Sequence, residues 1–453
     1  MPQLPFDYLD KACLAATSSA HGCSNAPTWE LEIEGQLTVA ELKVALGWLC
    51  QAYPTCGATV VPLDGNPLTA KHFAWQWQDR PPLANMVEFH DLREAPDDAL
   101  AELRDAVHDR FVDLFTTPPL LLVLAWLPGL RAQLFVKQHH ALADGHAMVD
   151  MLPDFAELLN HARHGSAPQT LSVIPRRAEL DAFAETQWLR RWRLLGGVWE
   201  YVKSAWKSLF HPLTELKQNL SLDYSGGNRT LHVDVPEAQI LEWKSAAKAQ
   251  GGNLNAMLCA GFLVANRRWN ELQGVQVQRM NATTAIDFRP RDQPFRSFAN
   301  HLGFHIPDLN HAQLRSIDTA MPEILAQVRA QNARLAHRRR YFLERAVALS
   351  LKMQDFRKLL FSSPRTVVNL NFSNLQALPL PLLHGEGWQV TAVRVNTPLI
   401  PRTAIVLTVT NYAGDTTLNF NFKASVVQRQ DVEALCGMFL EEVTRFVDSA
   451  ARK

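Results

Sequence analysis

The sequence predicts an α/β protein made of two sandwich-like halves, and three observations support this fold class. The chain has 453 residues, 47% of them hydrophobic and 20% charged, which allows a large core and exceeds one ordinary domain. Helical and strand-like patterns alternate in both halves. From about 166 to 230 the composition changes to prolines, a Trp- and Arg-rich stretch and the polar segment YSGGN. We therefore place a first lobe at 1–175, a connection at 176–230 and a second lobe at 231–453.

Hydrophobic spacing sets the elements of the first half. Apolar residues recur at intervals of three and four in two stretches, which is typical of helices that bury one face. The runs LLLVLAWL and RAQLFVKQ flank Pro128 and Gly129, which predicts a hairpin. In order, the predicted elements are a helix at 39–53, a strand at 58–63, a helix at 98–115, strands at 120–127 and 131–138, and a helix from 147 that stops at Gly165.

The second half repeats this mixture of helices and strands. In order, it predicts a strand at 231–235, helices at 241–250 and 254–269 separated by Gly251 and Gly252, a strand at 277–286, two strands between 404 and 424, and a final helix. The chain contains no G-x-G-x-x-G, Walker or G-x-S-x-G motif. The pattern therefore favours α/β sandwiches over a dehydrogenase, kinase or α/β-hydrolase fold.

The bulk composition argues against several partners and compartments. Lys plus Arg and Asp plus Glu each number 45, so no net field attracts polyanions and we expect no nucleic-acid binding. The six cysteines form no C-x-x-C pair, which favours packing roles in a reducing compartment. The N-terminus lacks a signal-peptide pattern, and the longest apolar run is far shorter than the roughly 20 residues that span a bilayer. We expect a cytoplasmic protein.

The most informative stretch is HHALADG at 139–145, between the hairpin and the helix that follows it. Imidazole has an unperturbed pKa of about 6.5, so a histidine fixed at a strand end can act as a general base. Because side chains alternate along a strand, His139 and His140 should face opposite ways, one into a cleft and one into the fold. Asp144 could cap the helix or hold a cation, and Gly145 should permit a tight turn.

Three other interpretations of these residues stay open on spacing alone. The two histidines could be ordinary surface or packed side chains. His140, Asp144 and His146 could ligate zinc, although the sequence has no H-E-x-x-H motif, and we expect no metal site. A Ser-His-Asp hydrolase is the third interpretation, for which no nucleophile elbow is visible.

HHALADG resembles the H-H-x-x-x-D-G motif of an acyltransferase superfamily. Its members include chloramphenicol acetyltransferases, nonribosomal peptide condensation domains, polyketide-associated acyltransferases and wax ester synthase/diacylglycerol acyltransferases. As in the two-lobed members, the motif lies about a third of the way along the chain, after a strand and before a helix. AIDFRPRD at 285–292, NHLGFH at 300–305 and LNFSNLQALPLP at 370–381 extend the similarity over nearly the whole chain.

The resemblance implies two chloramphenicol acetyltransferase-like lobes that meet in a V, with His140 in a tunnel between them. It implies acyl transfer from a thioester to a hydroxyl or amine, in which His140 deprotonates the acceptor without an acyl-enzyme. It also implies that Asp144 is structural and pairs with an arginine, for which Arg289 is the candidate. No cofactor is expected apart from the co-substrate, acyl-coenzyme A or acyl-phosphopantetheine.

Acyl transfer also needs donors that stabilise the oxyanion formed at the thioester carbonyl. Backbone amides near Gly145 are one candidate set. The hydroxyl of Ser373 and the amide of Asn374 are a second, although both residues could equally form a strand-end turn.

Two basic segments bear on substrates and partners. Residues 188–210 interleave four tryptophans with five basic residues, which suits a membrane surface, an apolar substrate entrance or packing between lobes. The segment AHRRRYFLER at 336–345 could bind coenzyme A phosphates or an acidic carrier protein, or be a solvated helix face. The expected partners are thus an acyl thioester, an alcohol or amine, an acyl or peptidyl carrier protein, and a peripheral membrane contact.

Three functions follow from the sequence. The leading one is an O-acyltransferase that uses acyl-coenzyme A or an acyl carrier and an alcohol, giving a lipid-like ester. The second is a stand-alone condensation enzyme that forms an amide or ester from carrier-bound substrates. The third is a non-catalytic binding relative, against which the intact His140 and Asp144 argue.

Overall fold

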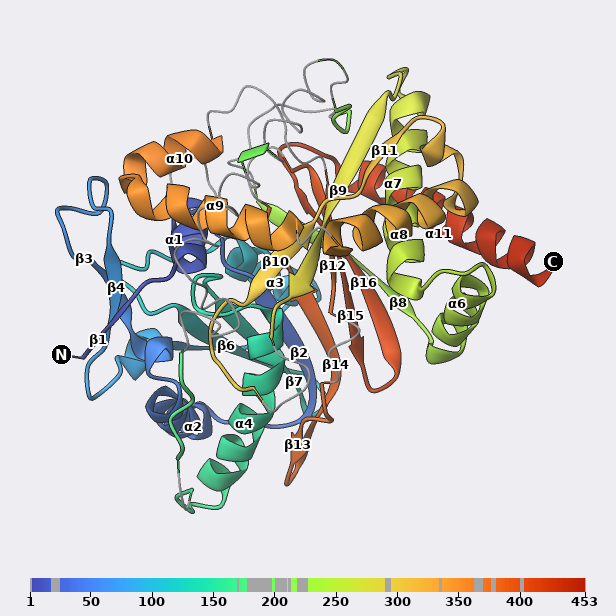
Figure 1. The fold of residues 1–453 in the computed structure, drawn as a ribbon. Helices are drawn as coiled ribbons and strands as arrows, with labels where there is room; N and C mark the ends of the chain where they lie inside the picture. The colour runs from blue at the N-terminus through green and yellow to red at the C-terminus, as the bar shows by residue number, and fades with distance from the viewer. Residues whose placement is uncertain are drawn as a thin grey trace.

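The structure, a computed structural model, consists of two lobes, each formed by a large mixed β-sheet with its own helices (Figure 1). It describes residues 2–17, 25–168, 171–176, 198–199, 210, 213–217, 227–289, 295–333, 336–361, 370–375, 380–399 and 403–452. The predicted two-lobed α/β fold class is confirmed. The interlobe tunnel stays a prediction.

The first sheet carries the histidine motif at the end of one of its central strands. Its order is β13 (His384–Gly385), β14 (Trp388–Asn396), β2 (Thr28–Gly35), β7 (Arg131–Gln138), β6 (Leu120–Leu127) and β5 (Val87–Asp91), antiparallel except for the β5–β6 pair. Helices α2 (Val39–Ala52) and α4 (Gly145–Arg163) pack on one face, and α3 (Ala99–Asp109) packs on the other.

The predicted hairpin of β6 and β7 is confirmed, and it sets the direction of the motif. Gly129 and Leu130 at its turn both have positive φ, 75° and 54°. Along β7, Leu134 and Val136 enter the core below α2 and α4, whereas Phe135 packs on the α3 side. This alternation continues into the two histidines that follow the strand.

The second sheet is built mostly from the later half of the chain. Its order is β10 (Leu302–His305), β9 (Arg279–Asp287), β12 (Leu370–Asn374), β15 (Ile405–Tyr412), β16 (Asp415–Lys423) and β8 (Asn228–Val235), and β11 (Asp308–Asn310) also pairs with β9. The core of this lobe contains residues of α6 (Glu237–Ala249), α7 (Leu254–Leu272), α8 (Ile317–Ala333) and α11 (Arg429–Ala451).

A third apolar cluster packs segments from the start of the chain against two helices from its later half. It combines α1 (Tyr8–Ala15) and the small sheet β1 (Gln3–Pro5), β4 (Phe73–Gln76) and β3 (Thr59–Pro62) with α9 (Ala336–Ser350) and α10 (Met353–Phe361). The buried Lys11 on α1 donates from Nζ to the carbonyl of Leu351 at 2.7 Å. Short 3-10 turns lie at Pro54–Gly57, Leu83–Asn85 and Gln313–Arg315.

The late strand β14 crosses back into the first sheet. It runs antiparallel to β2, and Trp388 lies opposite Gly35. Gly35 has φ of 98°, and a Cβ there would lie 2.0 Å from the carbonyl oxygen of Gly387, so only glycine fits this approach. The segment 231–453 therefore contributes strands to both sheets.

Most predicted elements are confirmed, with shifted ends. The helix predicted at 98–115 is α3 and stops at Asp109, and Asp113 then forms a turn in which its carbonyl accepts from the amide of Thr117 at 2.8 Å. The helix predicted from 147 begins two residues earlier, at Gly145. Gly165, predicted as its stop, has φ of 62°.

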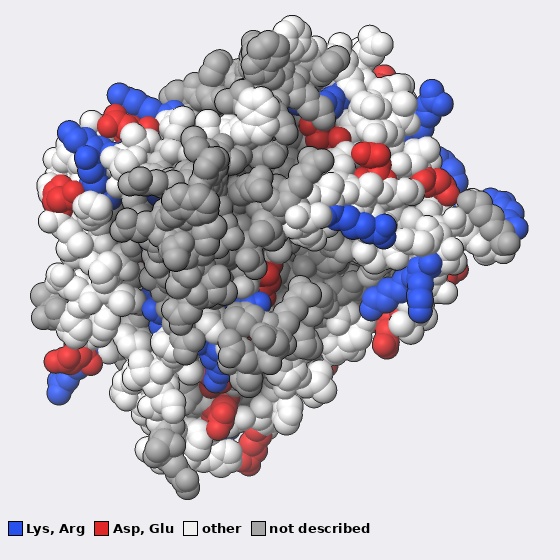
Figure 2. Space-filling view, viewed as in Figure 1, with Lys and Arg blue, Asp and Glu red and all other residues white. Residues whose placement is uncertain are grey.

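The segment predicted as a membrane or substrate surface, 188–210, lies outside the described residues except at 198–199 and 210. In the described part of the chain, none of the helices is long and apolar enough to cross a bilayer. Figure 2 shows acidic and basic side chains together on the described surface of one face.

Candidate functional site

His139 is sealed in the fold and has a structural role. Its side chain is fully buried, and its Nδ1 accepts the amide of Ala141 at 3.0 Å. Since Nδ1 accepts, Nε2 carries the proton and donates to Thr17 Oγ1 at 2.7 Å. Burial lowers the pKa of His139 to about 3, so the ring stays neutral and closes the turn after β7.

His140 faces the opposite way and stays partly exposed at the junction of the lobes. Its Nδ1 lies 3.2 Å from Oδ1 of Asn300, which precedes β10 of the second sheet. The Nδ2 of Asn300 donates to the carbonyl of His140 at 2.8 Å, which fixes the orientation of the amide. Oδ1 therefore accepts a hydrogen bond from Nδ1–H, and Nε2 is the ring nitrogen that carries the lone pair.

Asp144 joins the motif to the second lobe through an ion pair. Its carboxylate binds both terminal nitrogens of Arg289, at 2.9 and 3.0 Å, and both side chains are buried. The same carboxylate caps α4 through the amide of Ala147 at 2.9 Å and accepts the amide of His301 at 2.7 Å. Burial opposes ionisation, but Arg289 and the two amides outweigh it and lower the pKa of Asp144.

Gly145 has a different role from the tight turn predicted for it. It opens α4 without a positive φ, so backbone freedom does not explain the glycine. A Cβ at this position would lie 2.8 Å from Cδ2 of Leu375, the residue after β12. The missing side chain instead lets the second lobe approach the start of α4.

Ser373 and Asn374 lie within β12 and not in a strand-end turn. They pair with Thr408 and Val409 of β15. The Nδ2 of Asn374 donates to Oδ1 of Asn255 at 3.1 Å. The end of β12 approaches the motif through Leu375.

A second interlobe pair, which the sequence did not predict, extends this network. Nδ1 of His146 donates to Asp287 Oδ2 at 2.6 Å, and Oδ1 of Asp287 lies 3.2 Å from Nη1 of Arg289. The hydrogen bond to Asp287 raises the pKa of His146. Burial opposes ionisation of Asp287, but His146 and Arg289 outweigh it and lower its pKa to about 2.

These pairs bear on the zinc interpretation. Two of its proposed ligands, Asp144 and His146, are already bonded to Arg289 and Asp287. Within the described ranges, no group of three His, Cys, Asp or Glu side chains is arranged to hold a metal ion.

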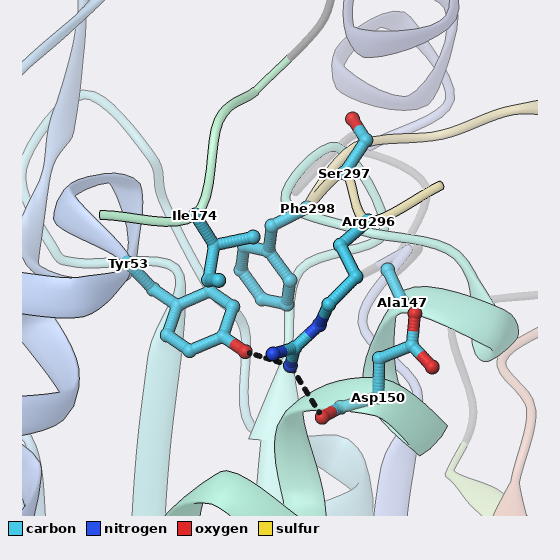
Figure 3. A pocket seen from close by; sticks show the side chains of 7 residues that line it. All are labelled: Tyr53, Ala147, Asp150, Ile174, Arg296, Ser297 and Phe298. Carbon is cyan, nitrogen blue, oxygen red and sulfur yellow. Dashed lines mark hydrogen bonds between the residues drawn. The ribbon is translucent and has the colours of Figure 1, made fainter. Parts of the chain in front are cut away.

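A small recess beside α4 marks where the segment before β10 is anchored (Figure 3). It leaves no enclosed room even for a water molecule, whereas small-molecule pockets usually start at ~300 Å³. Arg296 reaches across it and donates from Nη2 to Asp154 Oδ2 at 2.7 Å and to Tyr53 Oη at 3.1 Å. The ring of Phe298 packs edge-on against Tyr53. The recess is therefore the place where residues 296–298 pack against Tyr53 and α4.

The sequence pointed to the region of Asn300 but not to its role. NHLGFH contributes to the resemblance, whereas its spacing gives no sign that its asparagine bonds to His140. AIDFRPRD likewise contains both Asp287 and Arg289, of which the resemblance indicates only the arginine. Three of the four predicted phosphate-binding arginines, Arg338, Arg339 and Arg340, have side chains outside the described part, and the fourth, Arg345, is half-buried on α9.

Several solved structures from nonribosomal peptide synthetases share this fold. The first condensation domain of the calcium-dependent antibiotic synthetase, in complex with a substrate analogue, has a TM-score of 0.70 and 15% identity, covering 99% of this chain and 97% of that one. The EpoB cyclization-docking bidomain from Sorangium cellulosum has a TM-score of 0.68 and 14% identity, covering 98% and 84%. The epimerization domain from the third module of tyrocidine synthetase B has a TM-score of 0.66 and 12% identity, covering 100% and 99%.

No protein-family model and no curated protein sequence matches the chain. The structural neighbours are condensation, cyclization and epimerization domains. At identities of 12% to 16% they establish the two-lobed fold over the whole chain and leave the reaction open.

Proposed function

We propose that this protein transfers an acyl group from a carrier-bound thioester to an amine or hydroxyl, with His140 as the general base. The contact between His140 and Asn300 carries the proposal, because it leaves Nε2 as the unprotonated nitrogen on a partly exposed ring. The condensation domains among the structural neighbours form amide or ester bonds from carrier-bound substrates, which supports this reaction class over an acyl-coenzyme A O-acyltransferase.

In the proposed reaction, Nε2 of His140 removes the acceptor's proton as its nitrogen or oxygen attacks the thioester carbonyl carbon. The C–S bond then breaks, and the departing sulfur takes the proton from the imidazolium and leaves as a thiol. The products are an amide or ester and the free thiol, and His140 returns to its starting state. A general base of this kind contributes typically ~10²–10⁴-fold to the rate.

The oxyanion needs donors close to the base. The amides of Gly145 and His146 open α4 ahead of Ala147, whose amide already caps onto Asp144. The first amides of a helix have no intrahelical acceptor, and the helix dipole favours negative charge there. We therefore favour Gly145 and His146 over Asn374, because the side-chain amide of Asn374 is already bonded to Asn255.

Product analysis with defined donors and acceptors tests the proposal. The protein is incubated with octanoyl or alanyl groups, loaded on a phosphopantetheinylated carrier protein or on coenzyme A, together with an amine or an alcohol. Mass spectrometry should find an amide or ester from the carrier-bound donor, and His140→Ala, with an unchanged circular dichroism spectrum, should form none. If only the coenzyme A thioester gives product, the donor is not carrier-bound. If the wild type and His140→Ala give equal yields, His140 is not the base.

The epimerization domain among the neighbours defines a second outcome of the same experiment. A histidine base can instead remove the Cα proton of a carrier-bound aminoacyl thioester. The same incubation in D₂O distinguishes the two reactions. If deuterium enters Cα of the alanyl donor and no amide or ester forms, His140 catalyses proton exchange and not acyl transfer.

A further inference from the structure

The loop between His139 and Asp144 has all its carbonyl groups satisfied, largely by side chains from distant segments. The carbonyl of His139 accepts the amide of Leu142 at 2.8 Å, and that of Ala143 accepts Nε2 of Gln138 at 3.4 Å. Asn300 binds the carbonyl of His140, as described above. The remaining carbonyls, those of Ala141 and Leu142, lie between the proposed base and the capping aspartate.

Arg176 binds both of these carbonyls. Its Nη2 donates to the carbonyl of Ala141 at 2.7 Å, and its Nη1 donates to that of Leu142. Nη1 also donates at 2.8 Å to the carbonyl of Phe298, on the segment that carries Asn300. The side chain is only 5% exposed.

A carboxylate and an aromatic ring hold this guanidinium from the other side. Nη2 forms an ion pair with Asp10 of α1, which is itself buried. The guanidinium carbon lies 5.2 Å from the ring centroid of Trp75, and the indole Nε1 of Trp75 donates to Asp10 Oδ2 at 3.3 Å. Asp10 and Trp75 therefore fix the position of the Arg176 guanidinium, to which the loop at 139–144 is hydrogen-bonded.

We propose that Arg176 is a positioning residue for His140. Its planar guanidinium binds the carbonyls of Ala141 and Leu142, which follow His140, and the carbonyl of Phe298, which lies two residues before Asn300. The positions of His140 and of its partner Asn300 therefore both depend on this guanidinium. A lysine has one ammonium group and no such fork. The effect on the reaction rate rests on the proposed function, whereas the effect on the ring of His140 does not.

Arg163 offers a matched control at the far end of α4. It too combines one carboxylate, Glu41 at 2.8 Å, with backbone carbonyls, those of Gln36 and Glu386. Arg163 is 18 positions beyond Gly145, which is about 27 Å at ~1.5 Å per helical residue. Loss of the Arg163 side chain should remove a similar set of hydrogen bonds without affecting the loop at 139–144.

The experiment compares Arg176→Lys, Arg176→Ala and Arg163→Ala in the full chain. ¹⁵N NMR of histidine-labelled protein, assigned with His140→Gln, reports which ring nitrogen of His140 carries the proton without any substrate. In both Arg176 variants we expect a mixture of tautomers, and in Arg163→Ala the wild-type signals. Added guanidinium chloride at low concentration should restore the wild-type signals in Arg176→Ala, which a purely structural defect would not allow.

The transfer assay gives the second readout. Once product formation is observed, kcat of Arg176→Lys should fall ~10²-fold with little change in KM, as expected for a misplaced catalytic group. Wild-type His140 signals in a folded Arg176→Lys would overturn the proposal, and so would equal kcat losses in the Arg176 and Arg163 variants. Absence of transfer by the wild type would count against the proposed function only, because the tautomer measurement stands without it.

Discussion

Loss of the Asp144 carboxylate should destabilise the fold strongly, because this one group serves both lobes. It accepts four hydrogen bonds, two from Arg289 and one each from the amides of Ala147 and His301. Asp144→Ala removes all four. It leaves a buried guanidinium whose closest remaining carboxylate oxygen is Asp287 Oδ1 at 3.2 Å.

The expected magnitude follows from these contacts. Breaking a buried ion pair costs about 3–5 kcal/mol, and loss of an N-cap typically costs ~1 kcal/mol. Asp287 and the carbonyl of Ala299, at 3.0 Å, still compensate part of the charge on Arg289. We expect Asp144→Ala to lower the free energy of unfolding by about 4 kcal/mol. Asp144→Asn keeps an acceptor for the cap and should cost about 2–3 kcal/mol.

Urea denaturation, followed by far-ultraviolet circular dichroism and by tryptophan fluorescence, measures these differences if the two transitions coincide. The double variant Asp144→Ala/Arg289→Met should be more stable than Asp144→Ala, because no unpaired charge remains. Glu433→Ala, which breaks an exposed pair with Arg429 on α11, is the control and should change stability little. A loss below about 1 kcal/mol in Asp144→Ala, or a double variant that loses the sum of both single effects, would show that the Asp144–Arg289 pair does not hold the lobes in this way.

Further predictions concern the other contacts of the motif. Asn300→Ala should lower kcat ~10²-fold in the transfer assay, because His140 loses the partner that fixes its ring; an unchanged kcat would contradict this role. Gly145→Ala should destabilise by about 1 kcal/mol, the low end for overpacking, because only the end of the Leu375 side chain has to shift, and the loss measured by urea denaturation should shrink when Leu375→Val is added. Burial lowers the pKa of His139 to about 3, so below the unfolded pKa of about 6.5 the unfolded chain binds a proton that the folded chain does not. Stability should therefore fall between pH 6.5 and 4, and His139→Asn should flatten that slope; equal slopes would show that His139 is not held neutral.

The amphipathic elements of the fold were predictable because their apolar spacing records which face is buried. That holds for α2, α4, α7 and the β6–β7 hairpin. The strands β2 and β14 were not predicted, although their pairing completes the first sheet. Sheet membership depends on where distant strands meet, and β14 enters the first sheet from late in the chain, which no local pattern records.

Apart from the Asp144–Arg289 pair, which the resemblance suggested across 145 positions, the predictable part of the site is local. Strand alternation placed His139 and His140 on opposite sides, and the position before a helix made Asp144 a cap. The contacts of Asn300 and Arg176 could not be predicted, because each crosses more than thirty positions of sequence to reach a backbone carbonyl. Carbonyl groups belong to every residue, so the sequence holds no signal for such contacts.

The base role of His140 is tested most directly by a single-turnover rate. Loss of the acyl group from the loaded carrier protein, with an amine in excess, is followed by intact-protein mass for the wild type and for His140→Gln. We expect a rate at least ~10²-fold lower in the variant at an unchanged melting temperature. Equal rates in the two proteins would contradict the base role of His140.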